Sequence, residues 1–276
     1  MHHRLSARHA LVAVIAAAVA WGTGGPTGAL LTQQGLTPLA VSFWRLASAA
    51  LWLILARLLT RRGPARPLVA AGSVRHVLSG LGLAVCQLGY FTAIPRVGVG
   101  TATVIALGAA PILVAVAARE RLTPALFAAV AGLGLLSATA GTASLTGIAA
   151  AVASAAGYTL TTLLNRNTPD PVTAALLGFI VGAVFLAPFA TLPATLTGWL
   201  LIAYFGLIPT AFAYTLFYTG LKTLKASTAA TVALLEPVVA AAIGILAFHE
   251  HLTAPALVGA AILLAAIAAQ SHRARN

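Results

Sequence analysis

Residues 100–123, GTATVIALGAAPILVAVAARERLT, return in altered form as residues 227–253, STAATVALLEPVVAAAIGILAFHEHLT. Both copies contain a Thr-Ala pair near the start, a proline within a long apolar run and Glu-x-Leu-Thr at the end. Pro111 and Glu120 are nine residues apart, and Pro237 and Glu250 are thirteen apart, a difference of about one helical turn. The stretch therefore indicates an internal repeat of apolar helices.

The composition is typical of a membrane protein. Hydrophobic residues make up 60% of the 276 residues and charged residues 7%, against roughly 45–50% and about 25% in soluble domains. These values exclude a soluble globular protein, and the high hydrophobicity excludes a disordered chain. At about 20 residues for each membrane-spanning helix, the chain has room for ten spans with short loops between them.

Apolar runs separated by Pro, Gly and Arg predict an all-α membrane protein with ten transmembrane helices. The first run contains Ala18-Val19-Ala20, which fits a signal-peptide cleavage site, but it continues to about Leu31 and is predicted to be an uncleaved span. The ten spans are placed near residues 10–31, 38–59, 75–94, 101–118, 124–140, 147–165, 172–192, 197–218, 228–248 and 255–270.

The ten spans divide into two halves of five, at residues 10–140 and 147–270. Because five is an odd number, the second half must cross the membrane in the opposite sense, so the halves are predicted to be inverted repeats, a common plan of secondary transporters. Thr123 and Thr253, each just ahead of a proline, are predicted helix N-caps.

The basic residues indicate an orientation. The net charge is +12, and the arginines flank apolar spans, so we expect no nucleic-acid partner. Of the sixteen Lys and Arg, all except Arg45 and Arg96 fall in tails and loops on one side of the ten-span arrangement. Because positively charged loops stay in the cytoplasm, both termini of this multi-pass protein are predicted to be cytoplasmic.

No catalytic or metal-binding motif is present. The sequence lacks a Gly-x-Ser-x-Gly elbow, a His-Glu-x-x-His pair and a P-loop. In His249-Glu250-His251 the two histidines are two residues apart, on different sides of a helix. Cys86 is the only cysteine. We therefore expect no enzyme activity, no metal and no cofactor, and no transport driven by nucleotide hydrolysis in this chain.

Several motifs resemble the drug/metabolite transporter superfamily, EamA type. They are Trp21-Gly22, Pro38 followed by Arg45, the two Thr-Ala…Pro…Glu-x-Leu-Thr segments, and Leu235-Glu236-Pro237-Val238 with Gly259 beyond it. The spacing between Pro111 and Glu120 is shorter than in the fuller second copy. The resemblance implies a ten-helix inner-membrane carrier that moves small organic metabolites, often amino acids outward, by alternating access.

Polar residues lie in stripes on four predicted helices. The sixth carries Tyr158, Thr161, Thr162 and Asn165, and the eighth carries Thr210, Tyr214 and Tyr218, at helical spacing. Gln87 and Tyr90 share a face of the third, and Trp21 and Thr23 lie in the first. Such residues also commonly hold membrane helices together. Helices one and six are repeat mates, as are three and eight, so we predict that these four line a substrate cavity.

Helices five and ten, the last pair of mates, carry almost no polar residue, and we expect them to face lipid or a second protomer. The partners expected for the chain are therefore a small-molecule substrate, the bilayer and, if it is not a monomer, a second copy through these two helices. Hinges are predicted where glycine and proline interrupt the spans, at Gly24, Gly25, Pro26, Pro111, Pro209 and Pro237.

Two charges lie deep in predicted spans, Arg45 in the second and Glu236 in the ninth. Charge within a bilayer is expensive, so it indicates a functional or paired role, although Arg45 could snorkel outward and Glu236 could be protonated. We predict a coupling or substrate-binding role for both. The function predicted is export of small amphipathic metabolites such as amino acids, and the alternative is import or exchange of sugars or other small metabolites.

Overall fold

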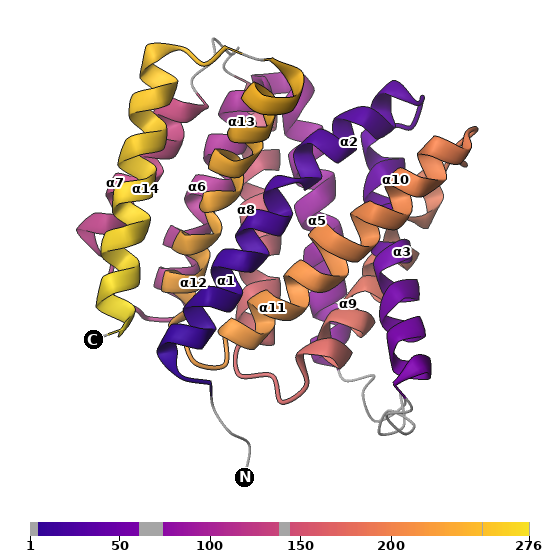
Figure 1. Cartoon of the computed structure of the whole chain (residues 1–276), viewed down its shortest axis with the longest axis horizontal. Helices are drawn as coiled ribbons and strands as arrows, with labels where there is room; N and C mark the ends of the chain where they lie inside the picture. The colour runs from indigo at the N-terminus through magenta and orange to yellow at the C-terminus, as the bar shows by residue number, and fades with distance from the viewer. Residues whose placement is uncertain (1–4, 61–73, 138–143, 250, 276) are drawn as a thin grey trace.

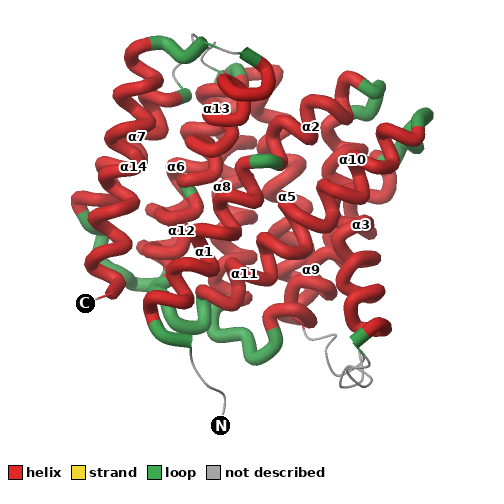
Figure 2. The backbone as a smooth tube through the Cα atoms, viewed as in Figure 1, coloured by secondary structure: helices red, strands yellow, loops and turns green. Residues whose placement is uncertain are grey.

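The computed structural model describes residues 5–60, 74–137, 144–249 and 251–275. All regular structure in these residues is helical, and short loops join the helices at two ends of a bundle (Figures 1 and 2). In chain order the helices are α1 (Ala7–Gly22), α2 (Gly24–Gln33), α3 (Pro38–Leu59), α5 (Val74–Val97), α6 (Val99–Ala117), α7 (Pro124–Leu136), α8 (Leu145–Asn165), α9 (Pro171–Leu186), η1 (Ala187–Phe189), α10 (Leu196–Gly206), η2 (Leu207–Phe212), α11 (Ala213–Gly220), α12 (Ala226–Ala233), α13 (Leu235–Phe248) and α14 (Ala254–Arg275).

The helices combine into ten membrane-crossing units. Nine units of the described chain are long and apolar enough to span a bilayer, and α7 is apolar but shorter. The first unit is α1 with α2, the eighth is α10 with η2 and α11, and the ninth is α12 with α13. The predicted all-α membrane fold with ten helices is confirmed. The predicted end of the first half, residue 140, lies outside the described residues.

The helix starts follow from their capping residues. Thr37, Thr123 and Asp170 each precede a proline at the first helical position, where its missing N–H costs nothing. The hydroxyl of Thr123 accepts a hydrogen bond from the Leu126 amide at 3.2 Å, and that of Thr253 accepts one from the Ala256 amide at 3.4 Å. Both predicted N-caps are confirmed.

Corresponding helices in the two halves of the chain have corresponding neighbours. The third unit, α5, packs along α8 and α9, and the eighth correspondingly packs along the first unit and α3. In addition, α3 packs against α9, its mate in the other half, and α7 packs against its mate α14. This is the pattern expected of two inverted repeats, and it supports the division at 10–140 and 147–270, which stays a prediction.

Glycine allows the closest helix approaches. A Cβ on Gly157 of α8 would lie 2.5 Å from the carbonyl oxygen of Gly82 on α5. At the contact of α7 and α14, a Cβ on Gly259 would lie 2.6 Å from the carbonyl oxygen of Gly132. Neither contact has room for a side chain, so both helix pairs depend on small residues, as membrane helices commonly do.

The outward sides of α7 and α14 are apolar and open. Phe127 on α7 is 51% exposed and Leu257 on α14 is 55% exposed, whereas Leu263 on α14 is completely buried against α7. The two helices therefore cover each other on one side and leave a hydrophobic surface on the other, which in a bilayer would contact lipid or another protein.

Candidate functional site

Proline breaks two of the membrane-crossing units near their middle. A proline at position i removes the hydrogen bond to the carbonyl at i−4 and its ring clashes with that carbonyl. The residues four before Pro26 and Pro237 are Gly22 and Ala233, and these are the last residues of α1 and α12. The breaks themselves fall at Thr23 and Leu234, so that Gly24, Gly25 and Pro26 lie in the first turn of α2.

The two breaks lie against each other. A Cβ on Gly22 would be 2.5 Å from the Cβ of Val239 and 2.9 Å from the carbonyl oxygen of Glu236. Glu236 lies in the first turn of α13. In a first turn the helix N–H groups are unpaired and favour a negative charge. The two broken units, the first and the ninth, are therefore in contact, and the ninth carries the buried acid.

Arg45 of α3 lies near Glu236. The two side chains interact electrostatically, but they form no ion pair within the described part of the chain. The guanidinium Cζ of Arg45 lies 4.8 Å from the centre of the Phe205 ring, and its Nε has no hydrogen-bond partner among the described residues. A cation over an aromatic face is stabilised in a desolvated setting. The guanidinium thus keeps hydrogen-bonding capacity for another group.

Tyrosines from three further helices are within electrostatic range of Glu236. Tyr90 of α5, Tyr158 of α8 and Tyr214 of α11 each interact electrostatically with Glu236. Tyr214 also interacts with Arg45. We call Arg45, Tyr90, Tyr158, Tyr214 and Glu236 the central group. It joins residues that are up to 191 positions apart, from Arg45 to Glu236.

An aromatic cluster continues from the central group. The Trp21 ring packs against Tyr214 and Phe217, each with ring centres 5.0 Å apart. Tyr158 contacts Phe217 at 6.1 Å, and Tyr218 contacts Tyr214 at 5.8 Å. The indole Nε1 of Trp21 is buried without a hydrogen-bond partner in the described residues. Buried indole N–H groups usually have a partner, so this donor is available to a ligand.

Several of the predicted cavity residues also take part in helix packing. The Thr161 hydroxyl is buried and donates to the carbonyl of Ser79 on α5 at 2.9 Å. Tyr90 is hydrogen-bonded to Thr103 of α6 at 2.8 Å. The hydroxyls of Tyr158 and Tyr218 lie near Thr162 and Ser79 without a well-formed hydrogen bond. These residues hold α8 and α6 to α5 or lie in the core.

Thr23 and Gln87 do not take part in the contacts just described. The hydroxyl of Tyr204 donates to Thr23 at 3.0 Å, which ties the break in the first unit to α10. Gln87 of α5 is half-buried.

The remaining two predicted hinges differ from each other. Pro209 lies in η2, a π-helical turn between α10 and α11, and the hydroxyl of Thr210 donates to the freed carbonyl of Phe205 at 2.7 Å. Pro111 lies inside α6, which continues unbroken from Val99 to Ala117. The α-helix is therefore interrupted at Pro26, Pro209 and Pro237, whereas the helix that contains Pro111 is continuous.

Phe205 and Cys86 were missed as site residues. A straight α-helix would place Phe205 and Tyr214, nine residues apart, on opposite faces, and only the π-helical turn between them changes this phase. Cys86 interacts electrostatically with Arg45 and Glu236 and lies 3.6 Å from the Ser154 hydroxyl. Cys86 lies on the same stripe of the helix as Gln87 and Tyr90, so the sequence could have indicated it as a site residue.

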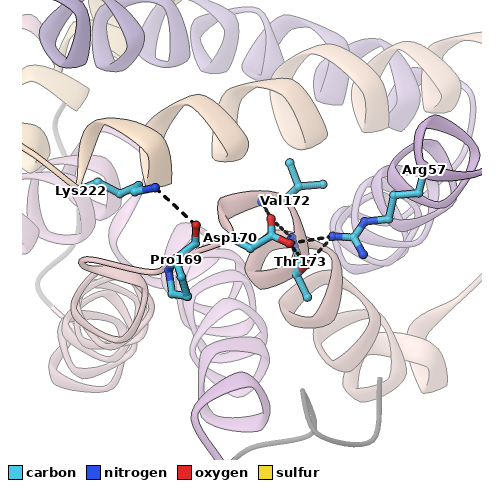
Figure 3. A network of polar contacts seen from close by, with 6 residues as sticks. All are labelled: Arg57, Pro169, Asp170, Val172, Thr173 and Lys222. Carbon is cyan, nitrogen blue, oxygen red and sulfur yellow. Dashed lines mark hydrogen bonds and ion pairs between the residues drawn. The ribbon is translucent and has the colours of Figure 1, made fainter. Parts of the chain in front are cut away.

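A polar network closes the end of the bundle that carries both termini (Figures 1 and 3). Asp170 caps α9 by accepting from the amides of Val172 and Thr173, both at 3.1 Å, and pairs with Arg57 of α3 at 3.2 Å. Lys222 donates to the carbonyl of Pro169. Burial by itself would raise the pKa of Asp170, but hydrogen bonds from Thr173 and the charge of Arg57 outweigh it and hold that pKa below its usual value.

Glu120 makes a second cap at the same end. Its carboxylate accepts hydrogen bonds from the amides of Ala226 at 3.1 Å and Ser227 at 2.9 Å, and it pairs with Arg166 at 3.4 Å. Ala226 and Ser227 are the first residues of α12, so an acid from the end of the fourth unit caps the start of the ninth. The loops rich in basic residues are thus bound together by the few acids of the chain.

The fold is that of a multi-pass membrane protein, and the comparisons place it in the class of transporters. Residues 141–270 match the model of the EamA-like transporter family. The chain is 31% identical to the uncharacterized transporter YwfM of Bacillus subtilis (strain 168), over 91% of this chain and 90% of that one. The chain belongs to the EamA-like transporter family.

Two further comparisons agree with this assignment. An uncharacterized transporter of Archaeoglobus fulgidus is 31% identical over 44% of this chain and 46% of its own length. One crystal structure superimposes with a TM-score of 0.76 over 97% of this chain and 99% of the other, at 21% identity, which shows that the fold is shared.

Proposed function

We propose that the protein is a secondary transporter of the bacterial inner membrane that exports small amphipathic metabolites such as amino acids. The observation that carries this proposal is the contact of the broken first unit with both charged elements: Gly22 lies against Glu236, and Gly24 lies against Phe205, over which the Arg45 guanidinium is held without an ion pair among the described residues. An amino acid carries the two complementary charges. Its carboxylate would bind Arg45, which can hold a carboxylate with two parallel hydrogen bonds, and its amine would bind Glu236.

The aromatic cluster supports an amphipathic substrate. Trp21, Tyr158 and Tyr214 offer large apolar surfaces with polar atoms at their edges, and the side chain of the substrate would pack against them. A binding site with a few polar groups in a mostly apolar lining is the usual form of a small-molecule site.

The broken helices support alternating access. The breaks at Thr23 and Leu234 touch each other and adjoin the central group, so a change of angle at either one would move the lining residues. Discontinuous helices that meet at the substrate site are typical of carriers built from inverted repeats. We propose that the halves 10–140 and 147–270 rock against each other about this point.

Counterflow in proteoliposomes tests the proposal. Liposomes loaded with one unlabelled amino acid should accumulate the labelled form, and Arg45→Gln and Glu236→Gln should each reduce this uptake more than tenfold, since each leaves one substrate charge unpaired. Arg119→Gln, which removes an exposed charge at the end of α6, is the matched control. Sugars tested in the same way examine the alternative, import or exchange of sugars or other metabolites. Flux that is not saturable would argue for a channel.

Direction and coupling need a second measurement. Cells expressing the protein should tolerate a toxic amino-acid analogue better than cells with an empty vector, because an exporter lowers its internal concentration. Glu236→Gln should abolish any pH dependence of transport, because it keeps the shape of the side chain and removes its titration. Unchanged flux and unchanged pH dependence in Glu236→Gln would leave Glu236 as a structural residue beside Pro237.

A further inference from the structure

A cavity lies at the end of the bundle that carries the termini, away from the central group. Its volume is about 390 Å³, within the roughly 300–1,000 Å³ of small-molecule pockets. It is bounded by the start of α1, the loop before α12, the starts of α12 and α7 and the last turns of α14. Figure 1 shows the start of α1, the start of α12 and the end of α14 together at this end. No residue of the central group lines it.

Three cations line this cavity. They are Arg121 at the start of α7, Lys225 just before α12 and Arg273 near the end of α14. Among the described residues none of the three is in an ion pair. The only acid in the lining is Glu120, whose carboxylate is engaged by the amides of α12 and by Arg166. The cavity therefore has an excess of positive charge that the described chain does not neutralise.

The rest of the lining offers hydrogen bonds. The hydroxyls of Thr123 and Thr228 flank the side chain of Gln270, which is 5% exposed and bonded to both, at 3.1 and 3.3 Å. This buried triplet fixes the wall between α7, α12 and α14. Thr223 and Ser227 add two more hydroxyls. Cations with hydroxyl and amide groups around a small cavity suit an anion with several acceptor oxygens.

The position of the cavity agrees with this chemistry. Each of the helices around it begins or ends there, so in a bilayer it lies at the level of the lipid headgroups. Basic pockets between membrane helices at this level bind the phosphate of anionic lipids. We propose that this cavity is a binding site for a phosphate-bearing anion, with Arg121, Lys225 and Arg273 as its cationic ligands.

Binding to the purified full-length protein in neutral detergent tests the site and its ligand. Thermal unfolding is followed during titration with inorganic phosphate, with short-chain phosphatidylglycerol and with phosphatidylcholine of the same chain length. Phosphatidylglycerol that raises the unfolding temperature to saturation identifies a lipid headgroup, and saturable stabilisation by phosphate alone identifies a soluble ligand. Stabilisation by phosphatidylcholine equal to that by phosphatidylglycerol, or none by any probe, overturns the proposal.

Variants separate the cavity from general surface charge. Lys225→Gln and Arg273→Gln should each weaken binding about fivefold, the effect of one basic residue near an anionic surface. Lys225→Arg should bind as the unchanged protein does, which also shows that position 225 tolerates substitution. Arg119→Gln removes a nearby exposed charge that does not line the cavity and should leave binding unchanged. Equal losses in Arg119→Gln and Lys225→Gln would contradict a defined site.

Discussion

Tyr158 and Thr161 show how closely binding and packing roles adjoin on one helix. They lie three residues apart on α8, yet Thr161 donates to the carbonyl of Ser79 on α5, while Tyr158 interacts with Glu236 and contacts the ring of Phe217. Tyr214 of α11 likewise interacts electrostatically with Arg45 and packs against the ring of Trp21. At the scale of single residues, the stripe on a helix therefore contains both kinds of side chain.

Tyr158→Ala and Tyr214→Ala are expected to lower transport several-fold or more while the protein still reaches the membrane, because they remove aromatic surface next to the charged pair. Uptake into proteoliposomes, normalised to the amount of protein, measures the effect. Leu264→Ala is the control, since Leu264 is 44% exposed on α14. The same loss of transport in all three variants would indicate that the tyrosines act in packing.

The broken units set the geometry of the site at the scale of the elements. Pro26 and Pro237 end α1 and α12 four residues earlier, and the approach of the two breaks requires glycine at position 22. At the ends of the elements, Asp170 joins the start of α9 to the last turn of α3, and Glu120 joins the end of the fourth unit to the start of α12. Polar contacts thus hold the ends of these helices, and prolines interrupt two of the units near their middle.

Gly22→Ala should destabilise the protein and reduce transport, because its Cβ would lie 2.5 Å from the Cβ of Val239 and 2.9 Å from a backbone oxygen. Overpacking of this kind costs about 1–3 kcal/mol. Gly25→Ala is a matched control, since no atom lies within 4 Å of its Cβ position, and alanine in a helix is favoured over glycine by about 0.5–1 kcal/mol. Thermal unfolding in detergent compares them; a Gly22→Ala variant as stable as Gly25→Ala would refute the close contact.

Asp170→Asn should remove a stabilisation that exists only above acidic pH. The pKa of Asp170 is lowered in the folded protein, so its contribution is present above the unfolded value of about 3.9 and is lost as the pH falls through the folded value. The side chain is 55% exposed, so the effect at pH 7 should stay below about 1 kcal/mol. Unfolding temperatures of both proteins should converge as the pH falls below the folded value.

Asp170→Ala serves as the comparison for this change. It removes the capping oxygen as well as the charge, and it should cost about 1 kcal/mol more than Asp170→Asn at neutral pH. A gap between the unchanged protein and Asp170→Asn that persists after Asp170 is protonated would show that the charge of Asp170 is not its source.

The whole molecule is organised by the exchange of its two halves and by charge. Corresponding helix pairs pack in corresponding ways, while Arg57 and Arg166 pair with Asp170 and Glu120 at the end that carries both termini (Figure 1). Positive loops are retained in the cytoplasm, so this end is predicted to face inward. The charged pair has no counterpart in the other half, because Gly178 and Ala110 occupy the equivalent positions by spacing.

Reporter fusions test this orientation. Fusions after Arg66 and after Lys225 should both report the cytoplasm, and a fusion after Gly198 should report the outside, because an even number of spans separates the first two points and an odd number separates either of them from the third. Opposite readings at Arg66 and Lys225 would refute the ten-span arrangement.

The sequence alone determined the number of helices, their approximate ends, the capping threonines and the helix interruptions at Pro26, Pro209 and Pro237, but it wrongly indicated one at Pro111. Each of these depends on local chemistry: apolar length for a span, a hydroxyl before a first turn, and a missing N–H at Pro26 and Pro237. Tertiary structure decided which polar residues meet. It placed Arg45 near Glu236, Phe205 under the guanidinium, and Thr161 against α5. A stripe of residues shows which side of one helix is polar. Which residues that side meets depends on how the helix axes cross and, at η2, on a change of helical phase.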